Sequence, residues 1–240
     1  MRQDHMPYWL KTALRRFEKA YAKHFLYPQF DAIGPGAAIS KPWNVEVVGA
    51  NIRIGQQVHI LCTSEEKTRF CTWKNDNHEG RIDIGDYVLI TPGARITSLA
   101  HVTIGSNTML ASHVYITDAD WHDTYDRTVQ GVKMAPVTLG DNVWIGDGSI
   151  ICKGVTIGDN SIIGARSVVV EDIPANVIAA GNPAKVVKPL DPDKPMVKRS
   201  DYFANPEKLD KEIDEIDQLL RQDNSFLKWA RTKIAPTTED

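Results

Sequence analysis

Aliphatic residues recur at every sixth position along the middle of this chain. The clearest run consists of Leu139, Ile145, Ile151, Ile157, Ile163 and Val169, most of them followed by a small residue. A period of six fits neither the helical period of about 3.6 nor the strand period of two. It fits a coil of three short strands, each of which contributes one inward aliphatic side chain. The pattern therefore predicts stacked triangular coils around a continuous aliphatic core.

A second pattern, two aliphatic residues flanking one other residue and then a glycine, marks the start of each coil. It ends at Gly55, Gly85, Gly105, Gly140 and Gly158, where tight turns need positive φ or close backbone approach. Eighteen residues separate Gly140 from Gly158, which is one bare coil, but 30 separate Gly55 from Gly85 and 35 separate Gly105 from Gly140. The excess predicts loops near 61–80 and 118–136, where functional residues are expected.

The two ends of the chain differ from the coil domain, expected over 30–188. Within an N-terminal part, 1–29, residues 7–27 predict an amphipathic helix with a basic face formed by Lys11, Arg15, Arg16, Lys19 and Lys23. We expect this helix to cap the first coils, with peripheral contact to an anionic membrane as the alternative. In the C-terminal part, 189–240, prolines precede two predicted helices, 206–222 and 225–233.

Composition narrows the class of protein. Hydrophobic residues make up 42% of the 240 residues and charged residues 25%, which is typical of a globular chain rather than a disordered one. The net charge of −3 lacks the basic excess that is typical of nucleic-acid-binding proteins. No apolar run approaches the roughly 20 residues that a membrane-spanning helix needs. Three cysteines without a C-x-x-C pair favour reduced thiols in a cytoplasm.

Three motifs carry a resemblance to a known family. They are Asp141-Asn142-Val143-Trp144-Ile145-Gly146, Ile173-Pro174-Ala175-Asn176-Val177, and Ala180-Gly181-Asn182-Pro183-Ala184-Lys185-Val186-Val187. With the repeats, they resemble hexapeptide-repeat acetyltransferases, most closely the maltose/galactoside O-acetyltransferase-like branch that includes enzymes acetylating bacterial surface sugars. The resemblance implies an all-β left-handed parallel β-helix, a homotrimer, acetyl-CoA as co-substrate without a metal, and a small-molecule or lipid-linked sugar acceptor.

Acetyl transfer to a hydroxyl needs a base, and a histidine has a suitable pKa. His122 lies in the second insertion, in a segment that resembles the family's catalytic loop, and precedes Trp144 by 22 residues. It is the expected general base for direct attack on the thioester, with His113 as the second choice. Its other ring nitrogen is expected to be held by Asp118, Asp120 or Asp123, or equally by a backbone carbonyl.

The resemblance also implies substrate-binding and cofactor-binding positions. Trp144, Trp121 and Thr91 are expected near the acceptor, and the first loop, with Trp73 and His78, is expected to shape its pocket. The implied coenzyme positions are Gly146, Gly164 and Ala165 for the pantetheine arm and Arg166, Lys185 and Lys188 for the phosphates, with Lys153 as an extra candidate. Arg166 and Val170-Glu171 depart from the residues usual in this branch.

Other functions use the same predicted scaffold. An N-acetyltransferase of an amino sugar, or a serine acetyltransferase, would differ only in the acceptor. A γ-class carbonic anhydrase would use three histidines on zinc, for which His101, His113 and His122 are the candidates. Their spacing of 12 and 9 residues lacks the pair five residues apart expected of that family. A binding scaffold without chemistry is the remaining alternative.

Overall fold

The computed structural model describes residues 5–237, and the side chains of all of these except 130–132 and 206. The chain divides into two compact units. One comprises Tyr21–Asp201, and the other joins the N-terminal residues up to Ala20 with the C-terminal residues from Tyr202. The sequence predicted separate parts over 1–29, 30–188 and 189–240, whereas the structure groups the two ends of the chain into one unit.

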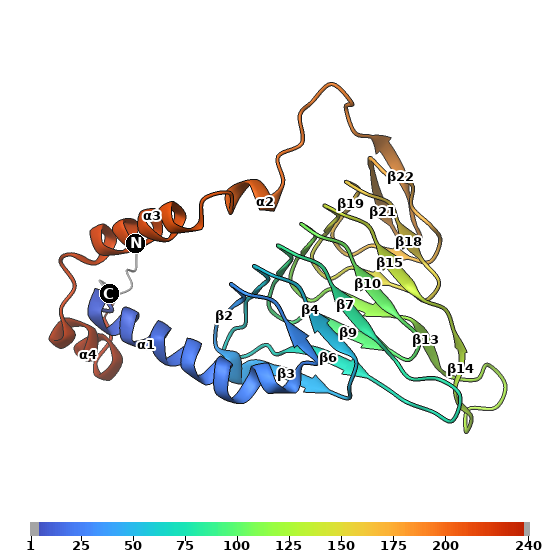
Figure 1. The fold of residues 1–240 in the computed structure, drawn as a ribbon, viewed down its shortest axis with the longest axis horizontal. Coiled ribbons are helices and arrows are strands. Elements are labelled where there is room, and N and C mark those ends of the chain that lie inside the picture. Colours follow the sequence, from blue (N-terminus) through green and yellow to red (C-terminus); the bar gives the residue numbers. More distant parts are fainter. Residues whose placement is uncertain (1–4, 238–240) are drawn as a thin grey trace. The chain divides into compact units, whose positions relative to one another are not determined.

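The larger unit is a stack of mostly parallel strands in three main sheets (Figure 1). In order within each sheet, the first contains β1 (Ala32–Ile33), β4 (Ile52–Ile54), β7 (Ile82–Ile84), β10 (Val102–Ile104), β15 (Val137–Leu139) and β18 (Thr156–Ile157). The second contains β2 (Ala38–Ile39), β5 (His59–Ile60), β8 (Leu89–Ile90), β11 (Met109–Leu110), β16 (Trp144–Ile145), β19 (Ile162–Ile163), β21 (Val177–Gly181) and β22 (Ala184–Pro189). The third contains β3 (Val45–Val48), β6 (Thr68–Thr72), β9 (Arg95–Ser98), β12 (Tyr115–Thr117), β17 (Ile150–Ile151) and β20 (Val168–Val169).

The six-residue period places one aliphatic side chain in each sheet in turn. Leu139, Ile145 and Ile151 belong to the first, second and third sheets, and Ile157, Ile163 and Val169 repeat that order one coil later. All six are at most 1% exposed, and each pairs in register with its equivalent in the next coil. The predicted aliphatic column, with three hexads per coil, is confirmed.

The repeat glycines serve close packing between coils. A Cβ on Gly105 would lie 2.3 Å from the carbonyl oxygen of Gly140, so only glycine fits there. The positive φ angles of these turns occur two residues later, at Asn107 (65°) and Asn142 (57°). Asparagine tolerates this left-handed conformation better than most residues. Of the two predicted reasons for these glycines, close approach is the one that applies at Gly105.

The predicted loop over 61–80 is wrong in its centre, because β6 (Thr68–Thr72) is a regular strand of the third sheet. Phe70 fills the core position there and is fully buried, but Thr68 and Thr72 are the buried residues beside it. These polar neighbours conceal the strand in the sequence. Two short segments leave the coil, the corner before β6 and a hairpin after it. The two arms of the hairpin are linked by the antiparallel bridge between Lys74 and Glu79.

The predicted loop over 118–136 is largely a β-hairpin. Strands β13 (Ala119–His122) and β14 (Gln130–Met134) pair antiparallel, with an irregularity between Asp120 and His122. The backbone nitrogen of Ala135 donates to the carbonyl oxygen of Asp118 at 2.9 Å and closes the base of the hairpin. His122 therefore lies on an ordered strand.

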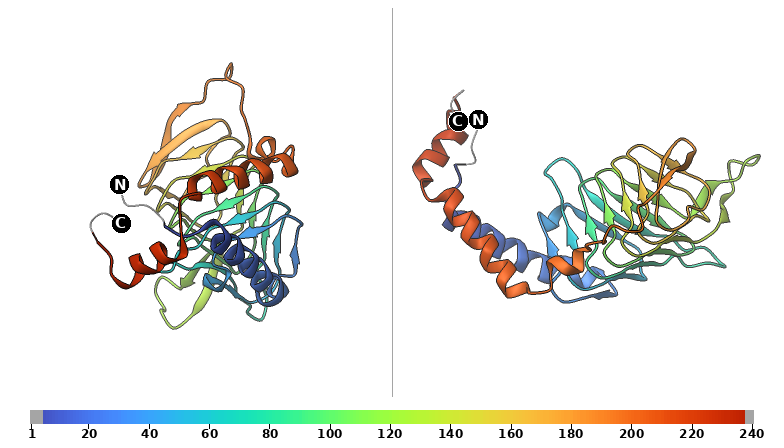
Figure 2. Two further views of the ribbon diagram at one scale, coloured as in Figure 1. Left: turned by 90° about the vertical axis from the view of Figure 1, so that its left-hand side faces the viewer. Right: turned by 90° about the horizontal axis from the view of Figure 1, so that it is seen from above.

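The second unit consists of helices from both ends of the chain (Figure 2). They are α1 (Tyr8–Tyr21), α3 (Pro206–Arg221) and α4 (Phe226–Ile234). The short helix α2 (Arg199–Tyr202) falls at the end of the larger unit in the sequence. The expected helices at 206–222 and 225–233 are confirmed. The expected helix over 7–27 is α-helical only to Tyr21 and continues as a π-helical turn (Ala22–Leu26) and a 3-10 turn (Tyr27–Gln29).

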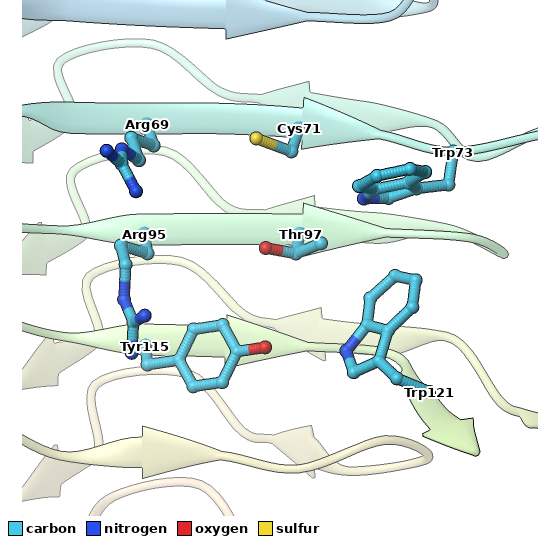
Figure 3. Close-up of a pocket in the computed structure, with 7 residues that line it drawn as sticks. All are labelled: Arg69, Cys71, Trp73, Arg95, Thr97, Tyr115 and Trp121. Carbon is cyan, nitrogen blue, oxygen red and sulfur yellow. The ribbon is translucent and has the colours of Figure 1, made fainter. Parts of the chain in front are cut away.

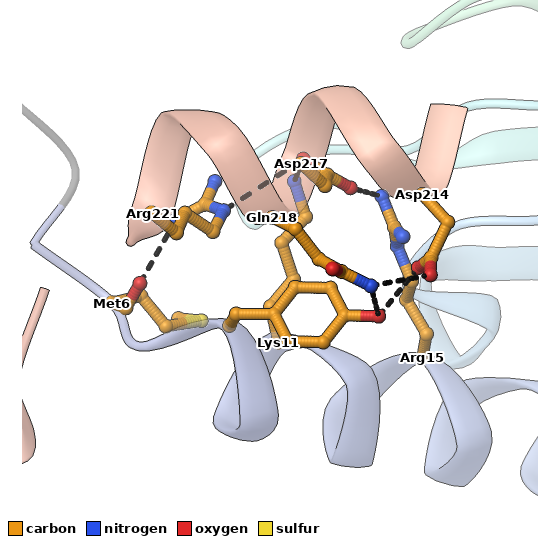
Figure 4. A network of polar contacts seen from close by, with 8 residues as sticks. Met6, Lys11, Arg15, Asp214, Asp217, Gln218 and Arg221 are labelled. Carbon is orange, nitrogen blue, oxygen red and sulfur yellow. Dashed lines mark hydrogen bonds and ion pairs between the residues drawn. The ribbon is translucent and has the colours of Figure 1, made fainter. Parts of the chain in front are cut away.

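A buried carboxylate joins α1 to α3 (Figure 4). Asp217, 8% exposed, accepts a hydrogen bond from Lys11 at 3.1 Å and pairs with Arg15 and Arg221. Burial alone would raise the pKa of Asp217, but the hydrogen bond from Lys11 and the nearby positive charges lower it overall. Two of the five basic residues proposed for membrane contact are thus used inside this unit. No helix in 5–237 has both the length and the apolar character needed to cross a bilayer.

Candidate active site

The exposed ring of His122 is fixed by the backbone of its own hairpin. Its Nδ1 lies 3.0 Å from the carbonyl oxygen of Arg127. A carbonyl oxygen only accepts, so Nδ1 carries the proton in this contact and Nε2 of the neutral ring is left with its lone pair. Of the two expected kinds of partner, an aspartate or a backbone carbonyl, the one that contacts this histidine is therefore the carbonyl.

The turn that presents the Arg127 carbonyl is built by Asp123. Its carboxylate accepts hydrogen bonds from the backbone nitrogens of Tyr125 at 2.9 Å and Asp126 at 3.0 Å. The hydrogen bonds from the Asp126 and Tyr125 backbones lower the pKa of Asp123. Asp123 thus shapes the loop that holds His122 without contacting the ring.

The two aspartates predicted as catalytic partners have other contacts. Asp118 is fully buried and accepts from the Ser98 hydroxyl at 2.6 Å and from the backbone nitrogens of Leu99 and Ala100 at 2.7 and 2.9 Å. Asp120 forms an ion pair with Lys153 at 2.9 Å. Neither carboxylate bonds to His122, because the first is directed into the coil stack and the second toward a lysine on the neighbouring coil. Lys153, an extra candidate for the coenzyme phosphates, is occupied by the same pair.

A pocket of about 220 Å³ lies on the outer face of the third sheet, beside the strand that carries His122 (Figure 3). Its lining consists of Arg69, Cys71, Trp73, Arg95, Thr97, Tyr115 and Trp121. The rings of Trp73 and Trp121 have centroids 5.9 Å apart and are tilted by 60°. The two insertions therefore meet at this pocket, since Trp73 comes from the first and Trp121 from the second.

Sequence reasoning identified the two tryptophans but missed the rest of this lining. Arg69, Arg95 and Tyr115 are outward residues that adjacent strands place in register. Their separations in sequence are unequal, because the insertion between β6 and β9 differs in length from a bare coil. Their shared outward position on adjacent strands could have grouped these residues, but only if the sequence had shown that β6 is a strand.

The remaining acceptor candidates lie around the second sheet. Trp144, the first residue of β16, points outward and is 47% exposed. Thr91, just after β8, donates its hydroxyl to the carbonyl oxygen of Leu110 at 3.1 Å. His122 follows the third sheet, so the structure places the expected base and these two residues on different sides of one chain.

The expected coenzyme positions are partly engaged in the fold. A Cβ on Gly146 would lie 2.5 Å from the backbone nitrogen of Ala165, so these residues are close because their coils stack. The Gly164 position likewise faces Ala180 of the following coil. Arg166, with φ of 58°, and Lys188 are exposed and have no acidic partner among the residues that the structure describes. Lys185 forms an ion pair with Glu171 at 2.6 Å. Glu171 is one of the residues that depart from the family pattern, and it neutralises the charge expected to bind a phosphate.

The histidines proposed for a zinc site are separated. His101 bonds to Asp83 at 2.7 Å on the first sheet, whereas His113 bonds to Glu66 at 2.6 Å and approaches Asp147 at 3.5 Å. Over residues 5–237, no group of three His, Cys, Asp or Glu side chains is close enough to hold one metal ion. Within the described residues of one chain, the three histidines therefore do not come together.

We expect the imidazole of His113 to titrate above its ordinary pKa. The hydrogen bond to Glu66, followed by that to Asp147, favours the protonated ring and raises this pKa. The stability from this cluster is therefore full below the unfolded-state pKa of about 6.5 and is lost as the pH rises through the higher folded-state pKa. An NMR titration should show the raised pKa, and Glu66→Gln should lower it. An unchanged His113 titration in that variant would contradict the assignment.

Comparison with known proteins places the chain among enzymes of related architecture. A family model described as bacterial transferase hexapeptide (six repeats) matches residues 136–170. Nodulation protein L of Rhizobium meliloti is 34% identical over 163 residues, which cover 68% of this chain and 72% of that protein. The galactoside O-acetyltransferase of Escherichia coli is 46% identical over 96 residues, 39% of this chain and 47% of that enzyme.

A solved structure matches three quarters of this chain. A galactoside acetyltransferase in complex with coenzyme A has a TM-score of 0.51 and 29% identity, and the match covers 75% of this chain and 78% of that one. The chain spans about half the length of several curated relatives that it matches. With the six-residue column, the stacked parallel coils and the extended match to nodulation protein L, these similarities show that the chain belongs to the hexapeptide-repeat acetyltransferase family.

Proposed function

We propose that this protein transfers an acetyl group from acetyl-CoA to a sugar hydroxyl, with His122 as the general base. The observation that carries the proposal is the bond from Nδ1 of His122 to the Arg127 carbonyl, which leaves Nε2 free to accept a proton. The family of the chain and the coenzyme A named in the matched galactoside acetyltransferase complex support the choice of donor.

The reaction needs few groups from the protein. Nε2 of His122 removes the proton from the acceptor hydroxyl as its oxygen attacks the thioester carbonyl carbon. The carbon–sulfur bond then breaks, an ester is formed, and the proton passes from His122 to the departing sulfur, giving free CoA. The ring returns to its neutral form, so no acyl-enzyme is required. Asp123 positions the base by shaping the turn that presents the Arg127 carbonyl.

We also propose that the active protein is a trimer of left-handed coils, as its family implies. An apolar row on the outer face of the second sheet supports contact between copies, and its members pair in register: Leu89, Met109, Trp144, Ile162 and Ile178. Such a patch is typical of an interaction surface. Within one chain, Trp144 and His122 lie on different sides of the coil stack. A second copy would bring its own Trp144 beside His122. A monomeric mass by light scattering would contradict this arrangement.

Charged residues near the C-terminal coils are the proposed coenzyme contacts. Arg166 and Lys188 would meet the phosphates, because their charges are exposed and lack an acidic partner within the described chain. Lys185 would first have to leave Glu171. We place the reaction in the cytoplasm, where acetyl-CoA is available and where the free thiols of Cys62, Cys71 and Cys152 would stay reduced.

The proposal is tested by incubating the purified protein with acetyl-CoA and a panel of neutral, acidic and amino sugars. Thiol release should depend on the sugar, and mass spectrometry should find one acetyl ester per product. Acetylation of an amine alone would replace the O-acetyl assignment by N-acetylation. Thiol release that is indifferent to every acceptor would contradict transfer to a sugar.

A further inference from the structure

The pocket between the two insertions has an excess of positive charge. Arg69 and Arg95 line it, and its lining contains no aspartate or glutamate. Strands β6 and β9 place the two arginines directly side by side in register. Like charges on adjacent strands repel each other, so this arrangement is unfavourable without a compensating anion.

Among the residues that the structure describes, only one of the two arginines has an acidic partner. Arg69 pairs with Glu46 at 2.9 Å, and Lys67 lies 3.8 Å from the same carboxylate. Arg95 has no acidic partner in the described part of the chain, and its guanidinium carbon lies 4.4 Å from the centre of the Tyr115 ring. Stacking on tyrosine orients the planar guanidinium and leaves its hydrogen-bond donors available to an incoming anion.

The other end of the pocket is aromatic. Trp73 is 53% exposed, and with Trp121 it forms two inclined ring faces beside Thr97 (Figure 3). Exposed tryptophan offers an apolar surface, and the C–H face of a sugar ring matches such a surface. The volume of about 220 Å³ is below the roughly 300–1,000 Å³ of pockets that enclose drug-sized ligands, so it suits one sugar unit rather than a whole nucleotide.

We propose that this pocket binds a monosaccharide unit that carries a negative charge, with Arg95 on the anionic group and Trp73 and Trp121 on the ring. The inference rests on the proposed function in one respect, that this sugar is the acceptor or part of it. Because Trp121 immediately precedes His122, binding here brings an acidic saccharide to the strand that carries the base. The anion is a carboxylate or a phosphate, since both accept the paired donors of a guanidinium.

Direct binding without acetyl-CoA tests the pocket separately from the reaction. We expect calorimetric titration to find methyl glucuronide bound about 10- to 100-fold more tightly than methyl glucoside, the effect expected of hydrogen bonds to a charged group. Glucose 6-phosphate distinguishes a phosphate from a carboxylate as the preferred anion. Arg95→Gln should abolish the preference for either anion, while Arg95→Lys should retain part of it.

Matched variants separate the pocket from general charge effects. Arg53→Gln removes an exposed arginine from the outer face of the first sheet and should leave binding unchanged. Trp73→Leu should weaken the charged and neutral sugars alike. Equal binding of charged and neutral sugars by the wild type, or an anion preference that survives Arg95→Gln, would overturn the proposal. Acetyl transfer to neutral sugars alone would contradict the proposed acidic-sugar pocket but not the proposed acetyltransferase activity. Acid-selective binding without any acetyl transfer would contradict the proposed activity but not the pocket.

Discussion

Replacing His122 by alanine is expected to lower kcat by about 10²- to 10⁴-fold, the usual contribution of a general base. The side chain is exposed and its one described hydrogen bond is to the Arg127 carbonyl, so its removal should leave the thermal stability nearly unchanged. The measurement is acceptor-dependent thiol release at saturating acetyl-CoA, together with a melting curve of each protein.

His78 provides the matched control for this experiment. It is also an exposed histidine in an insertion, near the tip of the hairpin after β6, and its side chain is not part of the pocket lining. His78→Ala should retain the wild-type kcat. If His122→Ala turns over as fast as the wild type, the base is a different residue, and His113 would be the next to examine.

Replacing Asp118 by alanine is expected to destabilise the larger unit by about 3 kcal/mol or more. The fully buried carboxylate accepts three hydrogen bonds, from Ser98, Leu99 and Ala100, and each donor left without a partner costs about 1–3 kcal/mol. Urea denaturation followed by circular dichroism measures the change. The carboxylate of Asp118 anchors the residue that precedes β13 to Ser98, Leu99 and Ala100, so activity should fall together with the folded population.

Asp120→Ala is the control for this prediction, because it removes a neighbouring carboxylate from a partly exposed pair with Lys153. Its cost should be at most about 1 kcal/mol. The pH dependence of kcat in Asp118→Ala, measured where the protein is folded, distinguishes structural support from catalysis. A normal stability combined with a displaced pH profile would return Asp118 to the catalytic group in which the sequence had placed it.

The coil domain could be predicted because buried aliphatic side chains recur at every sixth residue of its sequence. Leu139, Ile145 and Ile151 occupy three successive sheets, and nothing other than a stack of coils keeps a six-residue column buried. Strand β6 escaped prediction because Thr68 and Thr72 replace the aliphatic signal around Phe70. Their backbone pairing with β3 and β9, rather than their hydrophobicity, makes this segment a strand.

Within the candidate site, the sequence pointed to the histidine more readily than to the groups around it. His122 stands out in the second insertion, but its partner is a backbone carbonyl, and a carbonyl has no signature in the sequence. The aspartates nearby were the visible candidates, yet Asp118 turns into the coil and Asp120 pairs with Lys153. The arginines of the pocket meet through register across strands separated by insertions of unequal length, and single-chain periodicity does not contain that information.

The last strands of the second sheet have a consequence for how the molecule behaves at high concentration. A stack of parallel strands ends in unpaired backbone groups, onto which the end of another molecule could add and begin a fibre. Here the final coil strand, β21, turns back through Pro183 into antiparallel β22, which carries Lys185 and Lys188 and stops at Pro189. Charge, proline and reversed direction together make this end a poor template for polymerisation.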